Sequence, residues 1–124
     1  IIIQRLGALS MSSNFMLLNQ AKKTIIFINK ELINYPKSEV VLKQNIEKNT
    51  YEIIELIFYY KINESNNKIK MKYLKELVVK LSMLDWYINM SYEKRIISKK
   101  KMESIIGFLT ELRKIVYGVI RSAE

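Results

Sequence analysis

A run of basic residues near the end of the chain is the densest concentration of reactive side chains in this sequence. Five of the eight positions from 94 to 101 are cationic, namely Lys94, Arg95, Lys99, Lys100 and Lys101. A cation at a helix N-terminus opposes the helix dipole, which destabilises the helix by about 0.3–1 kcal/mol per charge. A phosphate bound by these side chains and by the free amides of the helix would offset this destabilisation. The run therefore predicts a nucleic-acid-binding site, with fully solvated lysines as the alternative.

A second basic cluster contains Lys68, Lys70, Lys72 and Lys75. Because these lysines nearly alternate along the chain, we expect them to cover more than one face of a helix. We assign Lys68 and Lys72 to the predicted nucleic-acid site. Stacking on unpaired bases is a further possibility for the tyrosines Tyr59, Tyr60, Tyr73, Tyr87 and Tyr92. Tyrosines at helical spacing are, however, more typical of a core or an interface.

Catalytic chemistry has little support in the composition. The chain has no histidine and no cysteine, so the commonest general base, the commonest metal ligand and a thiolate nucleophile are all missing. The carboxylates of Glu52 and Glu55 lie among lysines, without the Glu-x-x-His pairs of a di-iron bundle. We expect a protein that is not an enzyme and that holds no metal or cofactor. Because nothing indicates an oxidising compartment, we expect it in the cytoplasm.

Three breaks divide the chain into the elements that position these residues. Pro36 removes an amide donor and disfavours helical angles at the residue before it. Residues 63–67 form a polar cluster, and Ser98 is the expected N-cap of a last helix. The helices are expected at about 15–34, 37–62, 66–93 and 99–122. Short connections between them predict an antiparallel up-and-down four-helix bundle over 16–124. We expect 1–15 to be an N-terminal extension that is disordered or that was added by cloning.

Apolar residues recur at alternating steps of three and four in the last three helices, the seam of helices that pack at about 20°. The second helix carries Leu42, Ile46, Asn49, Ile53, Leu56 and Tyr60 on this seam. The third carries Leu74, Leu77, Leu81, Leu84 and Ile88, and the fourth carries Met102, Ile105, Leu109, Leu112, Val116 and Val119. More apolar residues remain than one seam uses, which widens the core face and suggests contact between subunits.

The net charge is +9, from 21 basic and 12 acidic residues. Its distribution is uneven, because residues 38–62 hold three basic and four acidic side chains whereas every other quarter has a basic excess. This pattern favours a polyanionic partner, with solubility alone as the alternative.

Four stretches of the sequence resemble a known family. They are 35–39 (YPKSE), 46–56 (IEKNTYEIIEL), 77–92 with its Leu-x-x-Leu core, and 97–103 (ISKKKME). Together they make the chain similar, over about 16–122, to the Avd-like four-helix bundles, the accessory variability proteins of diversity-generating retroelements. The proline corner is shared with a sister family, the bundle proteins encoded by intervening sequences of 23S ribosomal RNA genes.

The sister family typically carries an Asn-Ile-Ala-Glu-Gly-like stretch in its second helix. Here residues 49–53 read NTYEI, which favours the Avd-like branch. The resemblance implies a pentameric barrel of four-helix bundles with a basic surface that binds RNA or DNA and associates with a reverse transcriptase. It implies no catalytic residue. The alternatives are a protein of the sister family and a purely structural oligomerisation or protein-interaction module.

Overall fold

The computed structural model describes the backbone of residues 2–124 and the side chains of residues 15–124. Four long helices account for most of the described chain: α1 (Ile2–Leu32), α2 (Val40–Ile62), α3 (Asn67–Glu93) and α4 (Lys99–Ala123). A short 3₁₀ turn, η1 (Lys37–Glu39), precedes α2, and residues 2–124 contain no strand. The predicted all-α fold with four helices packed against one another is confirmed.

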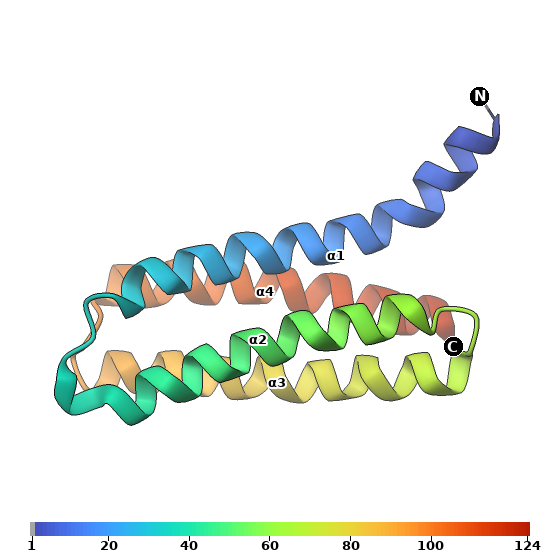
Figure 1. The fold of residues 1–124 in the computed structure, drawn as a ribbon. Helices are drawn as coiled ribbons and strands as arrows, with labels where there is room; N and C mark the ends of the chain where they lie inside the picture. Colours follow the sequence, from blue (N-terminus) through green and yellow to red (C-terminus); the bar gives the residue numbers. More distant parts are fainter. Residues whose placement is uncertain (1) are drawn as a thin grey trace.

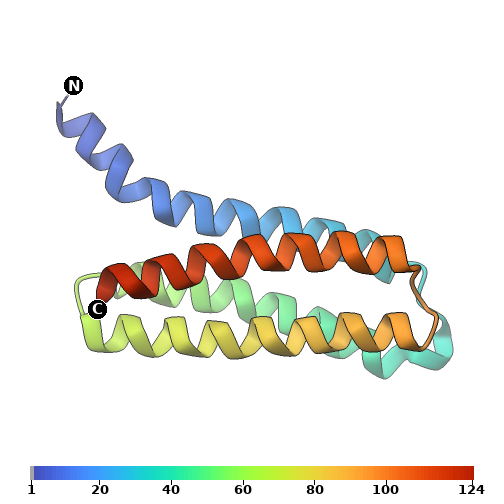
Figure 2. The same cartoon turned by 180° about the vertical axis from the view of Figure 1, so that it is seen from behind.

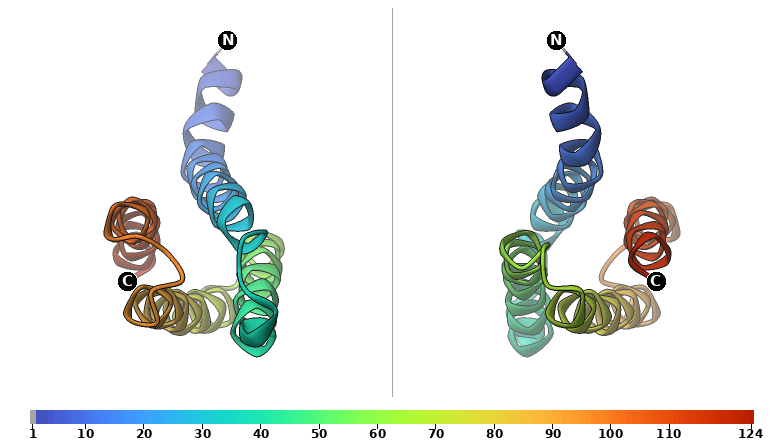
Figure 3. Two further views of the ribbon diagram at one scale, coloured as in Figure 1. Left: turned by 90° about the vertical axis from the view of Figure 1, so that its left-hand side faces the viewer. Right: turned by 90° about the vertical axis from the view of Figure 1, so that its right-hand side faces the viewer.

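Consecutive helices run side by side in opposite directions, and α4 closes the bundle against α1 (Figures 1 and 2). Seen along its axis, the bundle places one helix at each corner (Figure 3). Packing is most extensive between α2 and α3, and α1 meets both α2 and α4. The first turns of α1 lie away from the other three helices (Figure 1). Among the described residues, no helix combines the length and the apolar character needed to cross a membrane.

The sequence signals explain where three of the helices begin and end. Pro36 stands in an extended conformation just before η1, at φ −62° and ψ 151°, and separates α1 from α2. Asn66 and Ser98 cap the following helices, because their side-chain oxygens accept hydrogen bonds from the amides of Ile69 and Lys101. The predicted N-cap role of Ser98 is confirmed.

The first helix differs from its prediction. It begins at Ile2 rather than near residue 15, and it ends at Leu32, where the amides of Asn34 and Tyr35 turn back to the carbonyls of Glu31 and Leu32. The backbone of residues 2–15 is thus continuous with α1, whereas the side chains of residues 1–14 lie outside the described part of the structure.

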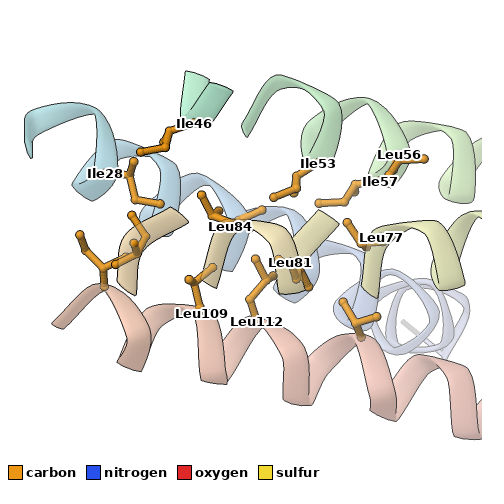
Figure 4. Close-up of a cluster of buried hydrophobic side chains, with 14 of the residues drawn as sticks. Ile28, Ile46, Ile53, Leu56, Ile57, Leu77, Leu81, Leu84, Leu109 and Leu112 are labelled. Atoms are coloured by element: carbon orange, nitrogen blue, oxygen red, sulfur yellow. The ribbon is translucent and has the colours of Figure 1, made fainter. Parts of the chain in front are cut away.

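The core follows the predicted seams. Every predicted seam residue of α2 and α3 is buried, and Figure 4 shows Ile46, Ile53, Leu77, Leu81 and Leu109 converging from three helices. On α4, the four central seam residues are buried, while Met102 and Val119 are only half-buried because they lie near the ends of the bundle. Burying one such side chain contributes about 1.5–3 kcal/mol, so this core accounts for most of the stabilisation of the bundle.

Four polar side chains are buried among the described residues, namely Thr24, Asn49, Thr50 and Ser91. Asn49, which is 5% exposed, is the one whose side-chain oxygen has no hydrogen-bond partner within the described part of the chain. A buried amide oxygen without a partner costs about 1–3 kcal/mol. Asn49 occupies a seam position of α2, where an apolar residue would otherwise be expected.

Candidate nucleic-acid interface

The structure gathers the five basic residues of the first predicted cluster at one end of the bundle. Lys94 follows the last residue of α3, Arg95 lies in the connection, and Lys99, Lys100 and Lys101 form the first turn of α4. All five are exposed. The turn between α1 and α2 lies at the same end, so its carboxylates are close to these cations (Figure 1).

Lys94 is engaged by that turn. Its ammonium donates hydrogen bonds to both carboxylate oxygens of Glu39, each at 3.1 Å. Because Glu39 belongs to η1 and Lys94 follows α3, the pair ties the α1–α2 connection to the end of the third helix. Lys94 is therefore a structural contact in the free protein as well as a candidate phosphate ligand.

Lys101 has two partners from α1. Its Nζ atom lies 3.2 Å from a carboxylate oxygen of Glu31 and 5.6 Å from the centre of the Phe27 ring. Lys99 is close to Glu103 on its own helix, at 4.0 Å. Two of the three cations at the start of α4 thus have carboxylate partners within the chain, and Lys101 also lies over an aromatic ring.

Arg95 and Lys100 are the two cations of the first cluster that contact no carboxylate among the described residues. Arg95 also has an unusual backbone, with φ at +62°. The amide of Ile96 reaches the carbonyl of Ser91, and the amide of Arg95 reaches that of Tyr92, both at 2.9 Å. These hydrogen bonds form a common helix-ending motif, in which glycine is normally preferred at the left-handed position. Here Arg95 occupies that position, and its side chain is exposed.

The second cluster divides between two faces of α3, as its near alternation predicted. Lys68, Lys72 and Lys75 recur at steps of four and three and line one shallow outer surface with Ile69 and Met71. None of these three lysines meets a carboxylate within the described part of the chain, and the ammonium of Lys72 lies 5.6 Å from the Tyr73 ring centre. Lys70 turns to the other side.

There Lys70 and Lys114 border a groove of about 530 Å³ between α3, α4 and the side chain of Met16. The sequence did not predict this groove, because its lining comes from all four helices and depends on how they pack. Its floor is formed largely by the apolar residues Ile115 and Val119.

The two basic clusters are not brought together. One lies at the start of α3, and the other lies where α3 ends and α4 begins, at opposite ends of the bundle (Figure 2). At about 1.5 Å per residue, Lys75 and Lys94, the nearest members of the two clusters, are roughly 28 Å apart along the helix. A single ligand that contacts both clusters must span most of that distance.

Most of the tyrosines are poorly placed to stack on unpaired bases, which requires an exposed ring. Tyr60 is 4% exposed, and burial together with the nearby Glu64 carboxylate raises its pKa to about 12. Tyr59 and Tyr73 stack on each other, with ring centres 5.0 Å apart and planes inclined by 14°. Tyr92, beside the first cluster, is the one that combines exposure with a position next to unpaired cations.

No family model matches the chain, and no curated protein is similar to it. Within the described residues, no group of three acidic side chains is placed to hold a metal ion.

Proposed function

We propose that this protein is a non-catalytic, basic accessory subunit that binds nucleic acid and partners a retroelement reverse transcriptase in the cytoplasm. One observation carries the nucleic-acid part: four predicted ligands, Arg95, Lys100, Lys68 and Lys72, are exposed and meet no carboxylate among the described residues, in a chain of net charge +9. Cations without internal partners are the ones that gain most from a phosphate.

Binding in this proposal is to the phosphate backbone of RNA or DNA. The sequence contains no base-reading motif, so the proposal assigns recognition to shape and charge. Lys94, Lys99 and Lys101 remain in the proposed interface. They contribute less, because each already lies near a carboxylate.

The polymerase partner and the pentameric assembly have a different basis. Both follow from the resemblance to the Avd-like bundles and from the apolar side chains left on the surface, of which Tyr51, Ile62 and Val79 are at least 60% exposed. In this role the subunit positions a template for the polymerase and contributes no catalytic group.

The test is RNA and DNA binding by fluorescence anisotropy at increasing salt. Charge reversal to glutamate at Lys68 and Lys72 together, or at Lys100 alone, should weaken binding. The slope of log affinity against log salt concentration should become less steep by about one unit for each lost phosphate contact. Lys22→Glu on α1 is the matched control, since Lys22 is exposed and lies outside both basic clusters. Affinity that is independent of salt, or unchanged in both variants, would rule the proposal out.

A second candidate is a structural module that binds only protein. The Lys94–Glu39 and Lys101–Glu31 contacts favour it, because they use two of the predicted ligands to hold the bundle together. It predicts a stable oligomer whose mass does not change when RNA is added at moderate salt. An origin within a 23S ribosomal RNA gene would instead indicate the sister family, whereas a neighbouring reverse-transcriptase gene would support the first proposal.

A further inference from the structure

The outer faces of α2 and α3 carry large apolar side chains that the core does not use. On α2, Tyr51, Phe58 and Ile62 are 74%, 47% and 78% exposed. On α3, Val79, Met83 and Trp86 are 60%, 39% and 56% exposed. The spacings of three, four and seven place each set on one face of its helix. Because α2 and α3 are neighbours, the two faces adjoin (Figure 3).

Carboxylates collect between these faces. Glu52, Glu55 and Glu76 line one groove between α2 and α3, and Lys80 is the cation beside them. Lys80 lies 3.0 Å from Glu52 and so neutralises that carboxylate. Glu55 and Glu76 are exposed and meet no cation among the described residues. On a strongly basic protein, this groove is therefore a place where a further lysine is favoured.

We propose that a second copy of this chain covers this surface, with the outer face of α2 packed antiparallel against the outer face of α3 from the other copy. The inference rests on the self-association included in the proposed function, and it specifies the contact. The symmetry axis runs parallel to the bundle, which allows a closed dimer or a ring.

Symmetry fixes the register of this contact. Within one copy, Lys80 lies beside Glu52 and Tyr73 stacks on Tyr59, which sets residues of α2 and α3 level with each other. Rotation about an axis parallel to the bundle preserves those levels between copies. Lys75 then comes within about half a helical turn of the second copy's Glu55.

The same register brings apolar side chains together. Val79 comes level, again within about half a turn, with the second copy's Tyr51. Trp86 lies over the second copy's Gln44, an uncharged position. Towards the start of α3, Lys72 and Lys68 come level with the second copy's Phe58 and Ile62, so this contact covers two of the predicted phosphate ligands.

Charge is the reason to choose a second copy as the occupant. Residues 38–62, which contain α2, are the one quarter of the chain without a basic excess. A contact between copies that leaves out α2 brings two basic surfaces together, which costs energy in a chain of net charge +9. The contact of α2 with α3 avoids this repulsion and covers exposed apolar side chains of both helices.

The chain has no cysteine, so single introduced cysteines report on the contact cleanly. Val79→Cys mixed with Tyr51→Cys should form an intermolecular disulfide on mild oxidation, because both positions are exposed and level in the proposed register. Val79→Cys mixed with Lys23→Cys on α1 is the control and should remain uncrosslinked. Equal crosslinking in the two mixtures would overturn the proposal.

Charge reversal provides the second measurement. Lys75→Glu and Glu55→Lys should each raise the dissociation constant of the oligomer by about tenfold or more. The protein that carries both changes should regain the original mass by light scattering. Lack of rescue, or a wild-type protein that is monomeric at all concentrations, would contradict the inference.

Nucleic-acid binding by the same variants separates this inference from the proposed function. Dissociated Glu55→Lys protein that still binds RNA in a salt-dependent manner would support both, because Glu55 lies outside both basic clusters. An intact oligomer that forms the crosslink between positions 79 and 51 but does not bind RNA would support the proposed interface and contradict the nucleic-acid role.

Discussion

The ammonium of Lys101 lies 3.2 Å from the carboxylate of Glu31 and 5.6 Å from the centre of the Phe27 ring. This arrangement joins the first turn of α4 to the last turns of α1. A residue that the sequence suggests as a phosphate ligand thus also closes the bundle. Any test of binding at this end must therefore distinguish lost contacts to nucleic acid from lost stability.

The first prediction makes that distinction. Lys101→Glu should lower the free energy of unfolding by about 1–2 kcal/mol, because it places a second carboxylate against the half-buried Glu31. Lys100→Glu should change it by less than about 0.5 kcal/mol, since Lys100 is exposed and has no carboxylate to lose. Urea denaturation followed by circular dichroism measures both. Equal stability of the two variants would contradict the structural role of Lys101.

The second prediction concerns Arg95, which holds a left-handed backbone conformation that glycine adopts without strain. Arg95→Gly should raise the free energy of unfolding by about 0.5–1 kcal/mol, while it weakens RNA binding. Arg95→Lys is the control, because it keeps both the charge and the strain. A destabilised glycine variant would show that the arginine side chain stabilises the turn.

The third prediction follows from the buried hydroxyl of Tyr60, whose pKa is raised to about 12 in the folded state. The ordinary tyrosine pKa is about 10, so the unfolded chain loses this proton first as the pH increases. Below about pH 10, Tyr60 therefore does not make the free energy of unfolding depend on pH. Between about pH 10 and pH 12 the free energy of unfolding falls as the pH rises. Tyr60→Phe should lose less stability over that interval, as measured by denaturation at pH 9 and pH 11. Parallel losses in the two proteins would refute the assignment.

The fourth prediction concerns the corner that includes Tyr35. Its buried hydroxyl donates a hydrogen bond to the Ser91 hydroxyl at 2.7 Å, and Ser91 in turn donates to the carbonyl of Tyr87. Tyr35→Phe should lower the free energy of unfolding by about 0.5–1.5 kcal/mol. A double-mutant cycle with Ser91→Ala checks the pairing, because the two losses should be less than additive. Additive losses would show that the two hydroxyls do not interact in solution.

The sequence predicted the elements and the core well, for local physical reasons. The steps of three and four identified the buried faces of α2 and α3, and Ser98 marked the start of α4 through the hydrogen bond that its side chain makes. These signals lie within a few residues of the feature that they specify. The start of α1 was less well predicted, because residues 12–14 (SSN) are of types that often cap a helix, yet α1 continues through them.

The partners of the lysines were not predicted. Glu39 and Lys94 are 55 positions apart, and nothing in their local sequence indicates that the α1–α2 turn lies beside the end of α3. The near alternation of Lys68, Lys70, Lys72 and Lys75 predicted two faces but not their surroundings. The groove beside Lys70 depends on where α4 and α1 lie, which is a property of the whole bundle.

The order in which the helices contact one another also bears on how the chain folds. Apart from the contact of α1 with α4, the helices pack against their sequence neighbours, so little loop entropy is lost before a pair is stabilised. Bundles with such local contacts fold within microseconds to milliseconds. The α2–α3 hairpin, with the most extensive packing, is the natural nucleus, and the meeting of α1 with α4 is the late step. Since Lys101 and Glu31 belong to that late step, their contact should slow unfolding while leaving the folding rate almost unchanged.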